Sequence, residues 1–252
     1  MANVLVEESS LSNIAKAIRY KNGTENTYKP SEMAGAIENI ETGGSGGEIY
    51  TPSYIRFDAY NGNSLVTQPI NTSLITDMSN VFYSCKQVTK LDLTGWDTSN
   101  VTTMANMFTN CTNLKKVIGL SKFNLNKVKT TANMFQYASY IETIELTGSD
   151  VSKLTNSSYM FAGCSKVTSI DLSTWTTPNL TNTKAMFLGC SVLANLDMRN
   201  ADFSKVTSSY SNMFYNVPTS CEIIVKDDTQ KEWITSKFTT LTNVKTVAEL
   251  EA

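Results

Sequence analysis

The sequence contains no histidine, the side chain most often used for acid–base catalysis near neutral pH. It also has no large excess of one charge, because its 21 Lys and Arg residues nearly balance its 23 Asp and Glu residues, for a formal net charge of −2. Such a chain has no overall basic field, so we expect neither nucleic acid nor anionic lipid as a partner. No stretch approaches the ~18 apolar residues of a membrane helix, so we expect no membrane insertion.

Common motifs of catalytic and metal sites are also missing. The sequence has no C-x-x-C pair, no Gly-rich phosphate loop and no Ser-His arrangement. A pair of carboxylates remains as a route to glycoside hydrolysis, but a regularly repeating column of acids makes a poor cleft. We therefore expect a protein that is not an enzyme and that has no catalytic residues, no cofactor and no metal.

What the sequence does contain is a repeat. Phenylalanine recurs at spacings of 26, 27, 26, 26 and 27 residues, and Met precedes it in five of the six cases. The series consists of Phe82, Phe108, Phe135, Phe161, Phe187 and Phe214. A fixed period of this length is typical of solenoids, in which each unit buries its apolar face against its neighbours.

Each unit combines two hydrophobic periodicities. In "KLDLT", Leu91 and Leu93 alternate with polar residues, which predicts a strand with both leucines inward. A second stretch has apolar residues three and four apart, which predicts one face of a helix or a tight helical turn. These residues are Val101, Met104, Phe108 and Cys111. The fold class predicted is an α/β repeat, a leucine-rich-repeat solenoid with a parallel β-sheet and helical turns.

Two of the units resemble a known family. "LDLTGWDTSNVTTMANMFTNC" and "IDLSTWTTPNLTNTKAMFLGC" are similar to the BspA-type bacterial leucine-rich repeat, which combines LDLS, an aromatic residue, DTSNV, MF and Cys in this order. The resemblance covers Ile75 to Val217. It implies a right-handed solenoid with a parallel sheet, found mostly on bacterial surface proteins and sometimes in phage tails. The departures at "KVIGLSKFNLNKV" and "LTGSDVSKL" predict local bulges after which the repeat resumes.

The chain divides into five regions by composition and pattern. "GGSGG" is typical of a flexible linker between pieces of different character. The expected regions are a helical docking or oligomerisation segment (1–42), a linker (43–48), an N-terminal cap (49–74), the solenoid (75–220) and a C-terminal cap (221–252).

The N-terminal segment has apolar residues at helical spacing and is too short to bury a core alone. We therefore expect it to dock on a partner or on copies of itself through Leu11, Ile14, Ile18, Met33, Ile37 and Ile40. Its stretch "LSNIAKAIRYKNGTENTYKPSEMAGAIENI" resembles a short helical segment at the front of tail and baseplate-associated proteins of phages that infect Gram-positive bacteria.

The C-terminal region predicts a cap for the last coil. "EIIVK" reads as a strand, and the next segment predicts a helix with Asp228 as its N-cap and with Trp233, Ile234 and Phe238 as apolar anchors.

Four cysteines share one position of the repeat, namely Cys85, Cys111, Cys164 and Cys190. A stacked column of thiols suggests a metal site or disulfides. However, Ala138 and Val217 hold the same position, which therefore requires only a small apolar group. We expect buried, reduced thiols.

The outward column of the predicted strands carries Asp92, Ile118, Glu145, Asp171 and Asp197, four of which are acidic. Stacked acids repel one another, so a cation or a hydroxyl-rich ligand such as a glycan would relieve them. The alternative is a solvated face that favours solubility. Trp96 and Trp175 follow the strands, where they either plug the turn or stack on sugar.

The ligand-binding residues that we expect are Lys90, Asp92, Glu145, Asp171, Asp197 and Arg199. The acids disfavour a polyanionic ligand.

Two functions fit a solenoid of this type. One is a phage tail-associated protein that recognises the host, and the other is a BspA-like adhesin on a bacterial surface. Neither "MANVLVEESS" nor "TVAELEA" offers an export signal or an anchor, which favours the virion protein. We expect assembly in the bacterial cytoplasm into the tail, as a homo-oligomer, with other tail or baseplate proteins and a host glycan or protein receptor as partners.

Overall fold

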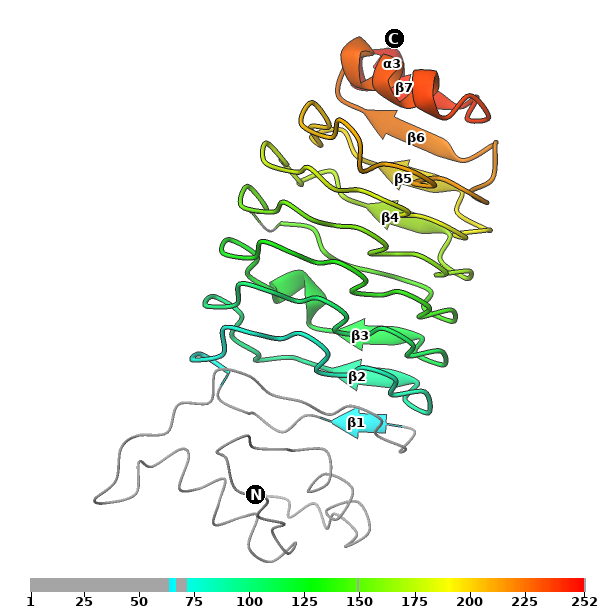
Figure 1. The fold of residues 1–252 in the computed structure, drawn as a ribbon. Helices are drawn as coiled ribbons and strands as arrows, with labels where there is room; N and C mark the ends of the chain where they lie inside the picture. Colours follow the sequence, from blue (N-terminus) through cyan, green and yellow to red (C-terminus); the bar gives the residue numbers. More distant parts are fainter. Residues whose placement is uncertain (1–63, 67–71, 149, 252) are drawn as a thin grey trace, which may run out of the picture.

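The computed structural model describes residues 64–66, 72–148 and 150–251, which form a parallel β-solenoid (Figure 1). Its strands are β1 (Ser64–Val66), β2 (Lys90–Asp92), β3 (Lys116–Ile118), β4 (Ser169–Asp171), β5 (Asn195–Asp197), β6 (Glu222–Val225) and β7 (Val244–Thr246). Every neighbouring pair is parallel and in register. The predicted leucine-rich-repeat solenoid with a parallel sheet is thus confirmed, whereas the segment 1–42 and the linker 43–48 lie outside the described residues.

The strands form two sheets, β1-β2-β3 and β4-β5-β6-β7. In the coil between them, residues 141–148 form no strand, although Ile144 and Leu146 are buried like their counterparts in the other coils. The Glu142 N–H still donates to the Lys115 carbonyl at 3.2 Å, so the coils stay stacked across the break. The solenoid core is therefore continuous while its sheet is not.

A local bulge lies where the sequence departs from the repeat. Gly119 occupies the inward position that Leu93 holds one coil earlier, and a short 3-10 helix, η1 (Leu120–Lys122), follows it. A Cβ on Gly119 would lie 2.9 Å from the backbone carbon of Leu93, so only glycine fits this approach. Leu120 is buried in place of the missing side chain. The bulge predicted for this stretch is confirmed.

The second half of each coil is not the helical turn that the apolar spacing predicted. In its place lie consecutive tight turns, in which Asn106 and Asn110 adopt left-handed φ values of 58° and 60°. The N–H of Met107 bonds within the coil to Met104, whereas the N–H of Phe108 bonds to the carbonyl of Met134 in the next coil. A left-handed residue at every fourth position interrupts a helix, and bonds between coils replace the intrahelical ones.

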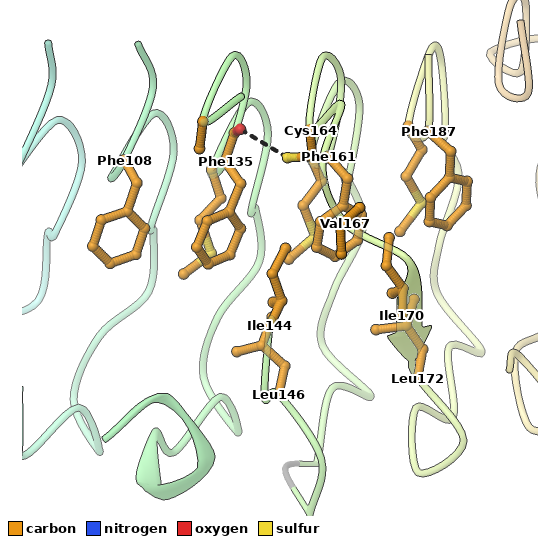
Figure 2. Packing of buried hydrophobic residues seen from close by; sticks show 14 of the residues in the cluster. Phe108, Phe135, Ile144, Leu146, Phe161, Cys164, Val167, Ile170, Leu172 and Phe187 are labelled. Carbon is orange, nitrogen blue, oxygen red and sulfur yellow. Dashed lines mark hydrogen bonds between the residues drawn. The ribbon is translucent and has the colours of Figure 1, made fainter. Parts of the chain in front are cut away.

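The phenylalanine series stacks through the core as predicted (Figure 2). Ring centroids of successive pairs from Phe82 to Phe214 lie 5.0–6.0 Å apart, with interplanar angles of 3–19°. All but Phe214, at 5% exposure, are fully buried. Each repeat thus contributes one ring to a continuous aromatic column.

The DTSN turn is explained by its hydrogen bonds. Asp97 accepts the N–H of Ser99 at 2.9 Å, and Asn100 donates to the carbonyl of Ser73 in the previous coil at 2.7 Å. The buried Thr98 hydroxyl donates to the Asn124 carbonyl at 3.0 Å and accepts the Asn124 N–H at 2.6 Å. The motif therefore joins three successive coils.

The C-terminal cap consists of β6, α3 (Asp228–Lys237), β7 and α4 (Val247–Leu250) (Figure 1). The predicted anchors are confirmed: Ile234 is fully buried, and Trp233 and Phe238 pack against the core. The predicted N-cap Asp228 is wrong by one residue, because Asp227 is extended and its carboxylate accepts the N–H of Gln230.

Candidate ligand surface on the strand face

The strand face is the surface formed by the outward residues of β2 to β5 and the strand ends. Lys90 and Asp92 lie on β2, Asp171 ends β4, and Asp197 ends β5 and is followed by Arg199. The register places Asp171 beside Asp197, but it pairs Asp92 with Ile118. Glu145 is exposed on the coil without a strand, so the predicted acidic column is divided.

The aspartates of this face also stabilise the backbone turns that follow the strands. Asp92 accepts the N–H of Thr94 at 3.0 Å, Asp171 that of Ser173 at 2.8 Å, and Asp197 that of Arg199 at 3.1 Å. Hydrogen bonds from the hydroxyl and N–H of Thr94 lower the pKa of Asp92. An aspartate that accepts the N–H two residues ahead closes a tight turn. These acids therefore have a structural role besides any contact with a ligand.

Arg199 forms an ion pair with Asp197. Its Nε donates to both carboxylate oxygens at 3.1 and 3.0 Å, and its Nη2 donates to Oδ2 at 2.5 Å. These hydrogen bonds raise the pKa of Arg199. The end of β5 thus presents a paired, formally neutral group to solvent.

The cysteine column is buried, as the sequence predicted. The thiols of Cys111, Cys164 and Cys190 each donate to a phenylalanine carbonyl of an earlier coil at 2.9–3.3 Å (Figure 2 shows the Cys164 bond). Burial raises the pKa of Cys190 to about 12 and that of Cys221 to about 11. Protonated, enclosed thiols are poor nucleophiles and poor metal ligands.

Within the part of the chain that the structure describes, no group of three or more Cys, Asp or Glu residues is arranged to hold a metal ion. Nor does any helix in that part have the length and apolar character to span a membrane.

The two tryptophans that follow the strands plug the turns. Trp96 and Trp175 are 5% and 2% exposed. The indole N–H of Trp175 donates to the Leu146 carbonyl at 3.0 Å, and the ring of Trp96 lies 5.7 Å from that of Phe82. Neither ring offers a face for a sugar.

The predicted docking residues of the N-terminal segment lie outside the described residues, namely Leu11, Ile14, Ile18, Met33, Ile37 and Ile40.

Two surface features escaped the sequence reasoning. Tyr137, Tyr140 and Tyr215 are 48%, 49% and 60% exposed. Tyr137 interrupts a position of the repeat that is otherwise polar or small, and that interruption was the available signal. The second feature is a local excess of lysine around β2 and β3, which a total charge conceals.

Comparison with known proteins places the repeat in a family. The sequence model of the family described as "Mycoplasma protein of unknown function, DUF285" matches residues 56–161 and 119–227, more than half of the chain. The match does not include the N-terminal segment 1–42. No curated protein is detectably similar to the chain.

Among solved structures, a leucine-rich repeat protein from Bacteroides ovatus ATCC 8483 shows 15% sequence identity. The similarity covers 66% of this chain and 63% of that protein's length, with a TM-score of 0.20. At this score the similarity adds nothing to the fold assignment, which rests on the strands and their register.

Proposed function

The chain belongs to the DUF285 family, and we propose that it is a non-enzymatic recognition protein that presents its strand face to a partner on a bacterial cell surface. We place it in a phage tail, where the segment 1–42 docks on tail or baseplate proteins, or on copies of itself, and the solenoid projects toward the host. The receptor in this proposal is a host glycan or protein.

The observation that supports this proposal most is the rigid, regular support of the strand face. Side chains from successive strands stand at the parallel-sheet spacing of ~4.8 Å, and their backbone is held by ladder and turn hydrogen bonds. Beneath them the phenylalanine column packs continuously from coil to coil. Such an array presents polar groups to a partner at low entropic cost, because the groups are already in place.

The test is binding of the labelled full chain to host cells, together with protection of those cells from phage adsorption. A variant with Glu145→Gln and Asp171→Asn removes two exposed charges from the face, and the new amide at position 171 still accepts the Ser173 N–H. The matched control is Asp150→Asn with Asp202→Asn, because these aspartates make the same backbone bond at 2.8 Å in other turns.

We expect the face variant to change cell binding at least threefold in either direction, while the control leaves it unchanged. The use of this face is contradicted if the parent chain does not bind cells, or if the Glu145→Gln, Asp171→Asn variant binds them as well as the parent chain does. Absence of the chain from purified particles contradicts the tail assignment alone.

A second candidate is a bacterial surface adhesin that binds host protein or glycan. The family description names a bacterium, Mycoplasma, and this favours the adhesin. Antibody labelling of intact bacterial cells and of purified phage particles separates the two, because an adhesin labels the cell and a tail protein labels the particle.

A further inference from the structure

The balanced total charge conceals a separation of charge along the solenoid. Residues 86–129 contain seven lysines and two aspartates, a surplus of five positive charges. Residues 142–251 contain nine basic and twelve acidic residues, a surplus of three negative charges. The field near β2 and β3 therefore differs in sign from that of the whole chain.

Four of these lysines, all exposed, form a basic strip on β2, β3 and the residues that precede them, namely Lys86, Lys90, Lys115 and Lys116. The parallel register pairs Lys90 directly with Lys116, at a strand spacing of ~4.8 Å. The Lys115 N–H bonds to the carbonyl of Thr89, and Asn113 donates to the carbonyl of Lys86 at 2.8 Å. The backbone segments that carry the four lysines are thus held side by side on two adjacent coils.

Little in the described part of the chain neutralises this strip. The ion pairs found there are Arg199–Asp197, Lys231–Glu249 and Lys245–Glu222, all toward the C-terminal end. Asp92 lies near Lys90, but its carboxylate also accepts the Thr94 N–H. Like charges placed opposite each other in a sheet repel, so this arrangement costs stability that a bound anion would recover.

We infer that the basic strip binds a linear phosphodiester polymer without bases, of the poly(glycerol phosphate) type. Residues 86–129 contain lysine but no arginine, and lysine binds phosphate as a point charge without the directional fork of arginine. Trp96, in the turn after β2, is buried and so offers no face on which a base could stack. Exposed Glu142 and Glu145 on the next coil limit the polymer to β2 and β3.

This inference rests on the proposed function, since it keeps the strand face as the binding surface, and it replaces the glycan or protein receptor with an anionic polymer of the cell surface. It replaces the expectation that an acidic face disfavours polyanions, because the acids of the face other than Asp92 lie on different coils from the four lysines.

The experiment measures binding of a fluorescent poly(glycerol phosphate) oligomer to the full chain between 50 and 200 mM salt. With four lysine contacts, the affinity falls roughly fiftyfold across this range, as counterion release predicts. Lys90→Gln with Lys116→Gln weakens binding about tenfold at low salt and reduces the fall to roughly sevenfold. Glu142→Gln with Glu145→Gln strengthens binding because it removes repulsion.

The matched control is Lys153→Gln with Lys166→Gln, which removes two exposed lysines outside the strip. We expect this control to stay within twofold of the parent chain. Three results overturn the inference. They are no binding of the oligomer, an equal loss of affinity in the Lys90/Lys116 and Lys153/Lys166 double variants, or tighter binding of a single-stranded DNA of equal charge. A chain that binds cells but not the oligomer refutes the inference and leaves the proposed function standing.

Discussion

Gly119 and Gly95 provide a matched test of how closely the coils approach. Both have positive φ, +93° and +89°, so alanine is conformationally strained at either position. At Gly95 an added Cβ meets nothing within 4 Å. At Gly119 the same atom lies 2.9 Å from the Leu93 carbon and 2.9 Å from the Thr94 nitrogen, both of which belong to the backbone of the preceding coil.

The expected costs follow from these two environments. Gly95→Ala incurs the left-handed strain alone, about 1–2 kcal/mol. Gly119→Ala incurs similar strain and also forces two coils apart, which adds about 1–3 kcal/mol for overpacking. Backbone atoms cannot rotate away as a side chain does. We therefore expect the free energies of unfolding of the two variants to differ by the overpacking cost, about 1–3 kcal/mol.

The assay is urea unfolding of the parent chain and of both variants, followed by far-UV circular dichroism. The slope of the free energy of unfolding against urea should be the same for all three, so that the midpoint reports stability. Equal midpoints for the two variants would refute the close coil contact at η1 and the explanation of the bulge.

Four further predictions use the same unfolding assay or thiol chemistry. Thr98→Val should destabilise the chain by about 1–3 kcal/mol because it leaves the Asn124 N–H without its acceptor, whereas Thr98→Ser should retain most of the stability. Phe135→Ala should cost about 3–5 kcal/mol through the cavity left in the column, and a cost below 1 kcal/mol would contradict its full burial. A thiol reagent should label the five cysteines only after denaturation, and fast labelling of the native chain would show that the column is open. Because burial raises the pKa of Cys190 to about 12 from an ordinary value of 9.0, the unfolded state loses its thiol proton first, so stability should fall as pH rises from about 9 to about 12.

The repeat made much of the fold predictable. Each residue of the phenylalanine series occupies the same position in its coil, so its stacking follows from spacing alone once the chain is read as a solenoid. The same reasoning located the strand of Leu91, the cysteine column and the anchors of the cap. At the cysteine position, Ala138 and Val217 showed which chemistry to expect, because a required ligand would not be replaced by an apolar group.

Other features could not be read from the pattern. Apolar residues three and four apart are common to an α-helix and to consecutive four-residue turns, so the spacing of Met104 and Phe108 did not separate the two. The acids presented a similar ambiguity, because Asp171 reads as a surface charge whether or not it accepts a backbone N–H. Ion pairing of Asp197 with Arg199 depends on side-chain geometry at a turn. The repeat period of the sequence does not reveal that geometry.

The sequence by itself determined the period of the solenoid and the inward or outward direction of each strand residue, because a side chain's burial repeats with its position in the coil. Only the tertiary structure decided the conformation of the connecting segments and which charged residues stand beside one another on neighbouring strands. The physical reason is that both depend on neighbours one repeat away. Phe108 bonds to Met134 and Lys90 stands beside Lys116, and neither contact exists until the coils stack.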